Sequence, residues 1–200
     1  TIPFLYNDLD EITNIVKSTP DLGVIKMEVT RNVEPKPGYL EGVRKLCNDH
    51  GIVLIFDECT SGFRETFGGI HLKYKVYPDM CMFGKALGNG YAITAVLGIR
   101  EVMEAAQKTF ISSTFWTERI GPTAALKTLE VMEREKSWEN ITATGFLIRN
   151  RLTRLADKYC LDIEHRGLPA LTGFTIKSGK SIAYKTLITQ EMLRKGYLAG

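Results

Sequence analysis

The chain has 200 residues, 44% apolar, 24% charged and 10% aromatic, which is close to the average of folded globular chains and excludes disordered, collagen-like and coiled-coil proteins. At this length roughly 70% of the unfolded chain's surface can be buried, so a substantial core is possible. Twenty-six Lys and Arg against 23 Asp and Glu give a net charge of +3, and these charges are scattered, which argues against a nucleic-acid partner.

The first half of the chain alternates between helical and strand patterns. Asp8 followed by Glu11 is a capping pattern that predicts the start of a helix. In chain order we expect a helix over 8–18, a strand over 23–29, a helix over 39–50 closed by Gly51, and strands over 52–56, 80–83 and 92–97. Strand, helix and an uninterrupted apolar strand form a βαβ unit. The predicted fold class is therefore α/β, with a mostly parallel sheet covered by helices on both faces.

The second half of the chain has a different order of predicted elements. Helices are expected near residues 100–107, 120–134 and 137–159, followed by alternating strands at 160–165 and 170–177 and a helix at 182–195. This order predicts a second, smaller α+β unit that begins near Lys136.

The cysteines at 47, 59, 81 and 160 are isolated, without a CxxC pair or a nearby His at ligand spacing. They favour reduced thiols over a zinc site or a disulfide framework. No apolar run reaches the roughly 18 residues of a membrane span, and no signal peptide is visible. We therefore expect a cytoplasmic protein without a membrane partner.

Asp57 and Glu58 directly follow the apolar run Ile52–Phe56. Ligands of open parallel sheets bind outside the carboxyl ends of the strands, which is where this pair would lie. A carboxylate there must be solvated, paired or ligand-bound, so something cationic should face Asp57.

Two site types share an apolar strand that ends in Asp-Glu. One is the magnesium strand of a P-loop NTPase, and the other is a strand whose carboxylate binds a cofactor's protonated ring nitrogen. The Gly-Lys pair Gly84-Lys85 does not fit a P-loop, because Ala86 follows it and Asp79 stands where the P-loop needs glycine. Lys85 instead sits in a glycine-flanked turn after a short strand. Such a turn suits a Schiff-base lysine, and an ordinary exposed lysine is the alternative.

Motifs spread over nearly the whole chain resemble the class III pyridoxal-phosphate-dependent aminotransferases, and within them the glutamate-1-semialdehyde 2,1-aminomutase branch. They include Pro37-Gly38-Tyr39-Leu40-Glu41-Gly42, His50-Gly51, Phe56-Asp57-Glu58, Gly62-Phe63-Arg64, Gly68-Gly69, Pro78-Asp79, Gly84-Lys85 and Gly88-Asn89-Gly90. The resemblance implies a fold type I enzyme that uses pyridoxal 5'-phosphate. Residues 1–135 would be the later part of its large cofactor domain, and 136–200 the beginning, truncated, of the small C-terminal domain.

The resemblance also implies roles for single residues. Lys85 would form the Schiff base and move the substrate's α-proton. Asp57 would hold the ring nitrogen protonated, and Glu28 would lie near the cofactor, although Val29 replaces the proline that usually follows it. Thr114 would bind the cofactor phosphate across a dimer interface, so a homodimer with a shared active site is expected. The alternative for Thr114 is a helix N-cap or a threonine at the end of a strand.

Substrate contacts are expected from Arg64, Trp116 and Arg119. Arg64 matches the arginine of the branch's Gly-Phe-Arg turn, and its alternative is a surface arginine paired with Glu58 or Glu65. Residues 116–119 replace the family's usual Ser-Gly-Asn-Pro with bulk and charge close to the phosphate threonine.

The expected function is amino transfer between a small-molecule amino donor and a carbonyl acceptor. The alternatives are an intramolecular aminomutase of the semialdehyde type, a non-catalytic partial cofactor domain and, more distantly, a nucleotide hydrolase.

Overall fold

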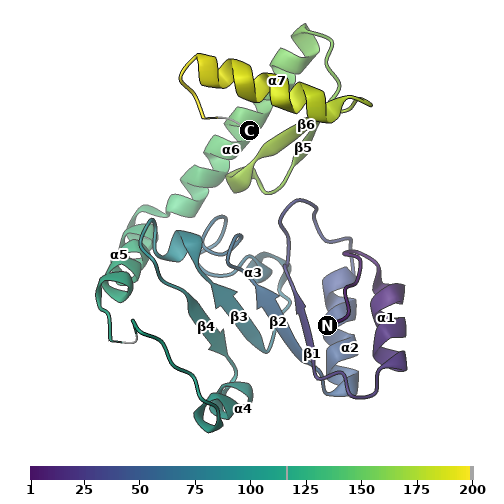
Figure 1. Cartoon of the computed structure of the whole chain (residues 1–200), viewed down its shortest axis with the longest axis vertical. Coiled ribbons are helices and arrows are strands. Elements are labelled where there is room, and N and C mark those ends of the chain that lie inside the picture. The colour runs from purple at the N-terminus through teal and green to yellow at the C-terminus, as the bar shows by residue number, and fades with distance from the viewer. Residues whose placement is uncertain (116, 199–200) are drawn as a thin grey trace. The chain divides into compact units, whose positions relative to one another are not determined.

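Four strands, β1 (Val24–Met27), β2 (Val53–Asp57), β3 (Met80–Phe83) and β4 (Ala95–Gly98), form one sheet in chain order (Figure 1). They belong to a computed structural model that describes residues 1–115 and 117–198. By their contacts the residues fall into two compact units, unit 1 (residues 1–140) and unit 2 (residues 141–200). The four-stranded sheet lies in unit 1.

Strand pairing decides the length of each strand. β1 pairs with β2, and β2 with β3, in parallel, while β4 runs antiparallel to β3. The mostly parallel sheet is therefore confirmed. The strand predicted over 92–97 begins only at Ala95, because β4 pairs residue by residue with the four residues of β3. β1 is likewise shorter than predicted and ends at Met27, opposite Phe56 of β2.

Helices α1 (Leu9–Ser18) and α2 (Tyr39–His50) form as predicted. The Asp8 carboxylate accepts the Glu11 backbone N–H at 2.9 Å, and Gly51 ends α2 in the left-handed conformation. α2 packs on β2, and α1 packs on α2. The core between these helices and the sheet is made of buried side chains from both helices and from one face of the strands: Ile12, Val16, Leu40, Val43, Cys47, Ile25, Met27, Leu54 and Phe56.

The opposite face of the sheet is more open than expected. Val53 and Ile55 of β2 and Met80 and Met82 of β3 are half-buried there, and Val24 is 49% exposed. Among the described residues, this face has less cover than the sequence predicted. The reason is that α2 packs on the buried face of the strands and α1 packs behind α2, so both add to the same layer.

The loop after β2 is held by one buried carboxylate. Glu58 has no exposed surface. Its oxygens accept the Ser61 hydroxyl at 2.9 Å, the Ile70 N–H at 2.7 Å, the His71 N–H at 3.0 Å and the His71 ring Nδ1 at 2.8 Å. His71 begins the short helix α3 (His71–Tyr74), which the sequence did not predict. His71 is itself buried against Glu58.

The remaining elements follow the predicted order with shifted ends. The helix expected over 100–107 divides into α4 (Arg100–Met103) and a 3-10 turn, η2 (Glu104–Lys108). α5 (Ile120–Glu135) and α6 (Ser137–Lys158) follow, separated by Lys136 in the left-handed conformation. The last elements are β5 (Ile163–Arg166), η3 (Pro169–Leu171), β6 (Gly173–Ile176), antiparallel to β5, and α7 (Ser181–Arg194). No helix of the described residues is both long and apolar enough to cross a membrane.

Within unit 2, α6 approaches η3 so closely that only glycine fits at the contact. A Cβ atom on Gly145 would lie 1.9 Å from the carbonyl oxygen of Pro169. The absence of a side chain at Gly145 therefore sets how near η3 lies to α6.

Gly145→Ala should destabilise unit 2 by about 1–3 kcal/mol, because the added methyl group overlaps a backbone atom that cannot turn away. Alanine in a helix interior otherwise stabilises by about 1 kcal/mol relative to glycine, so a loss would report the clash. Urea unfolding followed by far-UV circular dichroism measures the difference. Gly179→Ala is the control, since a Cβ there meets nothing within 4 Å. Equal midpoints for the two variants would contradict the close approach.

Glu58→Ala should lower the free energy of unfolding by about 3 kcal/mol, because Ser61, Ile70 and His71 would keep buried donors without an acceptor. Thermal and urea unfolding test this. Glu101→Ala, at an exposed position of α4, should change stability by no more than about 0.5 kcal/mol. A similar small effect for both variants would mean that the Glu58 cluster does not hold the loop.

Candidate active site at the carboxyl edge of the sheet

Asp57 is the last residue of β2, and its carboxylate is bound from two sides. The Cys59 backbone N–H donates to Oδ1 at 3.1 Å, and the Lys26 ammonium of β1 lies 2.9 Å from Oδ2. The expectation that a cation faces Asp57 is therefore confirmed, with Lys26 as that cation. The Asp57 side chain keeps 24% of its surface exposed, so it is open to a further ligand.

These contacts set the ionisation of Asp57. Burial by itself would raise the pKa of the carboxyl, but the hydrogen bonds from Lys26 and Cys59, with the charges of Lys26 and Lys85, outweigh it and lower the pKa below its usual value. Asp57 is therefore a carboxylate at neutral pH, which is the form that can bind a protonated ring nitrogen.

Lys85 begins a 3-10 turn, η1 (Lys85–Leu87), two residues after β3 ends. Its backbone φ is +43°, in the left-handed region that non-glycine residues seldom occupy. Such a conformation costs on the order of 1 kcal/mol and is found preferentially at functional sites. The side chain is exposed, and its Nζ donates to the Thr60 hydroxyl at 2.8 Å.

The turn that carries Lys85 is packed against the segment that follows Asp57. A Cβ atom on Gly84 would lie 2.7 Å from Cys59 Sγ, and one on Gly88 would lie 2.1 Å from the Tyr91 carbonyl oxygen. Close contact with backbone therefore requires glycine at position 88, whereas a side chain at position 84 would have to displace the Cys59 thiol. This packing and the parallel pairing of β2 with β3 bring Lys85 and Asp57 to the same edge of the sheet.

Arg64 lies next to this edge. Its Nε donates to the Thr60 carbonyl at 3.2 Å, and burial lowers the pKa of its guanidinium. The alternative pairing with Glu58 is not formed, because the Glu58 carboxylate binds Ser61 and His71 instead. The Thr60 backbone and hydroxyl thus contact Arg64 and Lys85, respectively.

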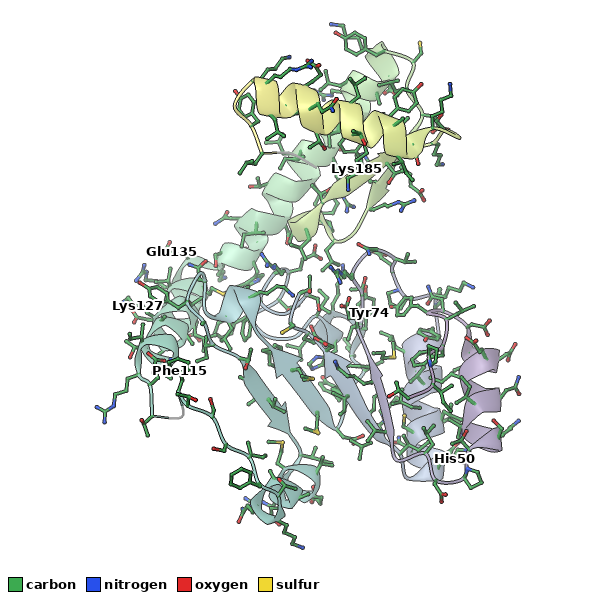
Figure 2. All side chains as sticks on the ribbon, viewed as in Figure 1. His50, Tyr74, Phe115, Lys127, Glu135 and Lys185 are labelled. Atoms are coloured by element: carbon green, nitrogen blue, oxygen red, sulfur yellow. The ribbon has the colours of Figure 1, made fainter. Side chains whose placement is uncertain are left out.

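Glu28 follows β1 at the same edge of the sheet as Asp57, because Met27 pairs with Phe56 in parallel. Its carboxylate pairs with Arg31 at 3.4 Å. Thr114 and Arg119 lie on the exposed segment between η2 and α5, where Phe115, labelled in Figure 2, is 76% exposed. Trp116 lies outside the described residues.

Glu118 has a structural role that the sequence did not indicate. Its carboxylate accepts the Gly121 N–H at 3.0 Å and the Ile120 N–H at the start of α5. One of the charges that residues 116–119 bring close to Thr114, that of Glu118, thus caps a helix.

Sequence reasoning missed Lys26 and Thr60. Thr60 carries no signal of its own in the sequence. Lys26 does, since it is a lysine within an otherwise apolar strand. Among the described side chains, no three His, Cys, Asp or Glu are grouped in a way that could hold a metal ion.

Comparison with known proteins adds independent information. The Aminotransferase class-III family model matches residues 32–199. A 3-aminobutyryl-CoA aminotransferase of Cloacimonas acidaminovorans (strain Evry) is 38% identical over 195 residues, which cover 94% of this chain and 47% of the relative. The chain thus spans about half the length of this curated relative.

Solved structures share the fold. The PLP internal aldimine form of FumI from Sphingopyxis sp. MTA144 superposes with a TM-score of 0.92 at 22% identity, covering 100% of this chain and 50% of that one. Ornithine aminotransferase of Plasmodium yoelii has a TM-score of 0.82 at 24% identity, covering 98% and 53%. These likenesses confirm the α/β fold, and the family is one of pyridoxal-phosphate enzymes. From the family match over most of its length, the chain belongs to the class-III aminotransferases.

Proposed function

We propose that the protein is a pyridoxal-phosphate-dependent aminotransferase that transfers an amino group from a small-molecule donor to a carbonyl acceptor. The observation that carries the proposal is the placement of Asp57 and Lys85 at one edge of the sheet, where an ionised carboxylate and a strained, exposed lysine face a common region. Family membership supplies the reaction class.

The side chains at this edge fit the cofactor. Asp57 already binds a cationic nitrogen donor, Lys26, so the carboxylate can also accept a protonated ring nitrogen. Lys85 offers a primary amine on a flexible stem, which suits covalent attachment to a carbonyl group. When bound, pyridoxal phosphate supplies an electron sink that stabilises negative charge beside the transferred amino group.

The chain's own residues then divide the work. Lys85 Nζ holds the cofactor and moves a proton at the substrate's α-carbon. Asp57 keeps the proton on the ring nitrogen. The Thr60 hydroxyl fixes the direction of the lysine side chain through its 2.8 Å hydrogen bond. Arg64, anchored on the Thr60 carbonyl, is positioned to bind an anionic group of the substrate.

The finer parts of the proposal concern assembly and domains. We assign the cofactor phosphate to Thr114 of a partner chain in a homodimer, a role supported by the exposure of Thr114. Trp116 and Arg119, on the same segment, would contact substrate, and Glu28 would border the cofactor. Residues 1–135 are assigned to the later large domain and 136–200 to the start of the small domain. The division after residue 140 supports that boundary. A cytoplasmic location fits the four free cysteines.

Borohydride reduction after incubation with pyridoxal phosphate, followed by peptide mass mapping, should give one main adduct, on Lys85. Lys85→Ala should abolish it. Lys75→Ala is the matched control, because Lys75 is also exposed and also has a left-handed backbone, with φ of +57°. This control should keep the Lys85 adduct in full.

Adducts spread evenly over surface lysines, or none at all, would overturn Lys85 as the attachment site. The chain would then be a non-catalytic partial cofactor domain. The same mapping on a longer form, should the chain be part of one, shows whether residues outside these 200 are needed for attachment.

Aminotransferase and aminomutase activities differ in their need for an acceptor. With L-alanine or 3-aminobutyryl-CoA as the donor, the cofactor's carbonyl absorbance should fall and should return only when a keto acid such as pyruvate or 2-oxoglutarate is added. Lys85→Ala should slow this half-reaction on the order of 100-fold or more, because it removes the proton-transfer group. Rearrangement of glutamate-1-semialdehyde at catalytic rate without an acceptor would instead establish the aminomutase branch.

A further inference from the structure

Lys26 stands where the fold does not call for a charge. Strands of parallel sheets are usually continuous apolar runs, because both faces become covered. β1 reads Val-Ile-Lys-Met, and among the described residues of this sheet's four strands Lys26 is the one charged side chain apart from Asp57 at the end of β2. A residue that breaks a local rule in this way needs a compensating contact.

That contact is Asp57, and the register of the sheet creates it. Lys26 pairs with Ile55, so Asp57 lies two residues further along β2 on the same face. The lysine stem spans this diagonal step and places Nζ 2.9 Å from Oδ2. The aliphatic part of Lys26 therefore runs along the open face of the sheet, while its charge reaches the site.

The ion pair changes what Asp57 can offer a cofactor. Oδ1 already accepts the Cys59 N–H, and Oδ2 accepts Lys26. Among the described residues, the charged groups that act on this carboxylate are Lys26 from β1 and Lys85 from the turn after β3, and both are cationic. A protonated ring nitrogen would be a further cation at a carboxylate that already has two cations acting on it.

We propose that Lys26 is a positioning residue that shares the Asp57 carboxylate with the cofactor's ring nitrogen and weakens the hold of that nitrogen on its proton. This role rests on the proposed function, since it needs pyridoxal phosphate at Asp57. Through Asp57, Lys26 would set how strongly the cofactor acts as an electron sink, without touching the cofactor's reacting atoms.

The test is nitrogen-15 NMR of pyridoxal phosphate, labelled at the ring nitrogen, on the wild-type chain and on Lys26→Met. The variant keeps an aliphatic stem and removes the charge. The ring nitrogen of the cofactor bound to Lys26→Met should stay protonated to a pH that is higher by roughly one unit or more than in the wild type. Lys26→Arg, which keeps the charge, should titrate like the wild type.

Two controls separate this effect from general damage. Lys45→Met removes another exposed lysine that pairs with an aspartate, Asp49 at 2.6 Å in α2, and should leave the ring-nitrogen titration unchanged. The second control starts from the Asp57→Asn variant. Adding Lys26→Met to it should no longer shift the pH at which the ring nitrogen loses its proton, because the proposed effect passes through the Asp57 carboxylate. Circular dichroism confirms that each variant is folded.

The cofactor-free chain provides a second readout. Carbon-13 NMR of the Asp57 carboxyl should show a higher pKa in Lys26→Met, because the hydrogen bond and charge that help to lower it are gone. If the ring nitrogen of the bound cofactor titrates identically in the wild type and in Lys26→Met, the role of Lys26 is overturned and the proposed function is not. Failure of the wild-type chain to bind the labelled cofactor would overturn the proposed function, and this role with it.

Discussion

The parallel pairing of β1, β2 and β3 is the constraint on which the candidate site depends. The carboxyl ends of parallel strands lie at the same edge of the sheet, so residues that are distant in sequence meet there. Asp57 ends β2, Lys85 follows β3, and Lys26 comes from β1. One shift in register would turn alternate side chains to the other face and separate Lys26 from Asp57. The chemistry is thus set by hydrogen bonds between backbones.

The adjacent carboxylates of Asp57 and Glu58 at this edge have different roles. Glu58 is fully buried and uses its oxygens to bind four donors from the loop and from α3, so it holds structure. Asp57 is partly exposed and keeps room for another donor. Asp57 ends β2 and Glu58 directly follows it, and successive residues of an extended backbone point to opposite sides. A rigid loop built on Glu58 then supports Thr60, which binds Lys85.

The strain at Lys85 is supported by its surroundings. Its left-handed backbone is unfavourable for a lysine, and the close contacts of Gly84 and Gly88 leave the turn little freedom to relax. The contact of Gly84 with the segment after Asp57 therefore fixes the turn and the carboxylate relative to each other. A lysine that must meet a cofactor repeatedly in one orientation benefits from such preorganisation.

Periodicity and turn residues in the sequence determined the α/β class, the order of the elements and the bounds of α2, since these follow from local apolar spacing and from Gly51. The sequence also predicted a cation opposite Asp57, because burying an unpaired carboxylate is costly. Only the tertiary structure decided which cation that is, that His71 is buried on Glu58, and that Thr60 binds Lys85. Those contacts depend on strand register and loop packing between distant residues, which local spacing does not encode. Glu118 shows the same limit, because its role as a helix cap depends on the backbone of α5 beside it.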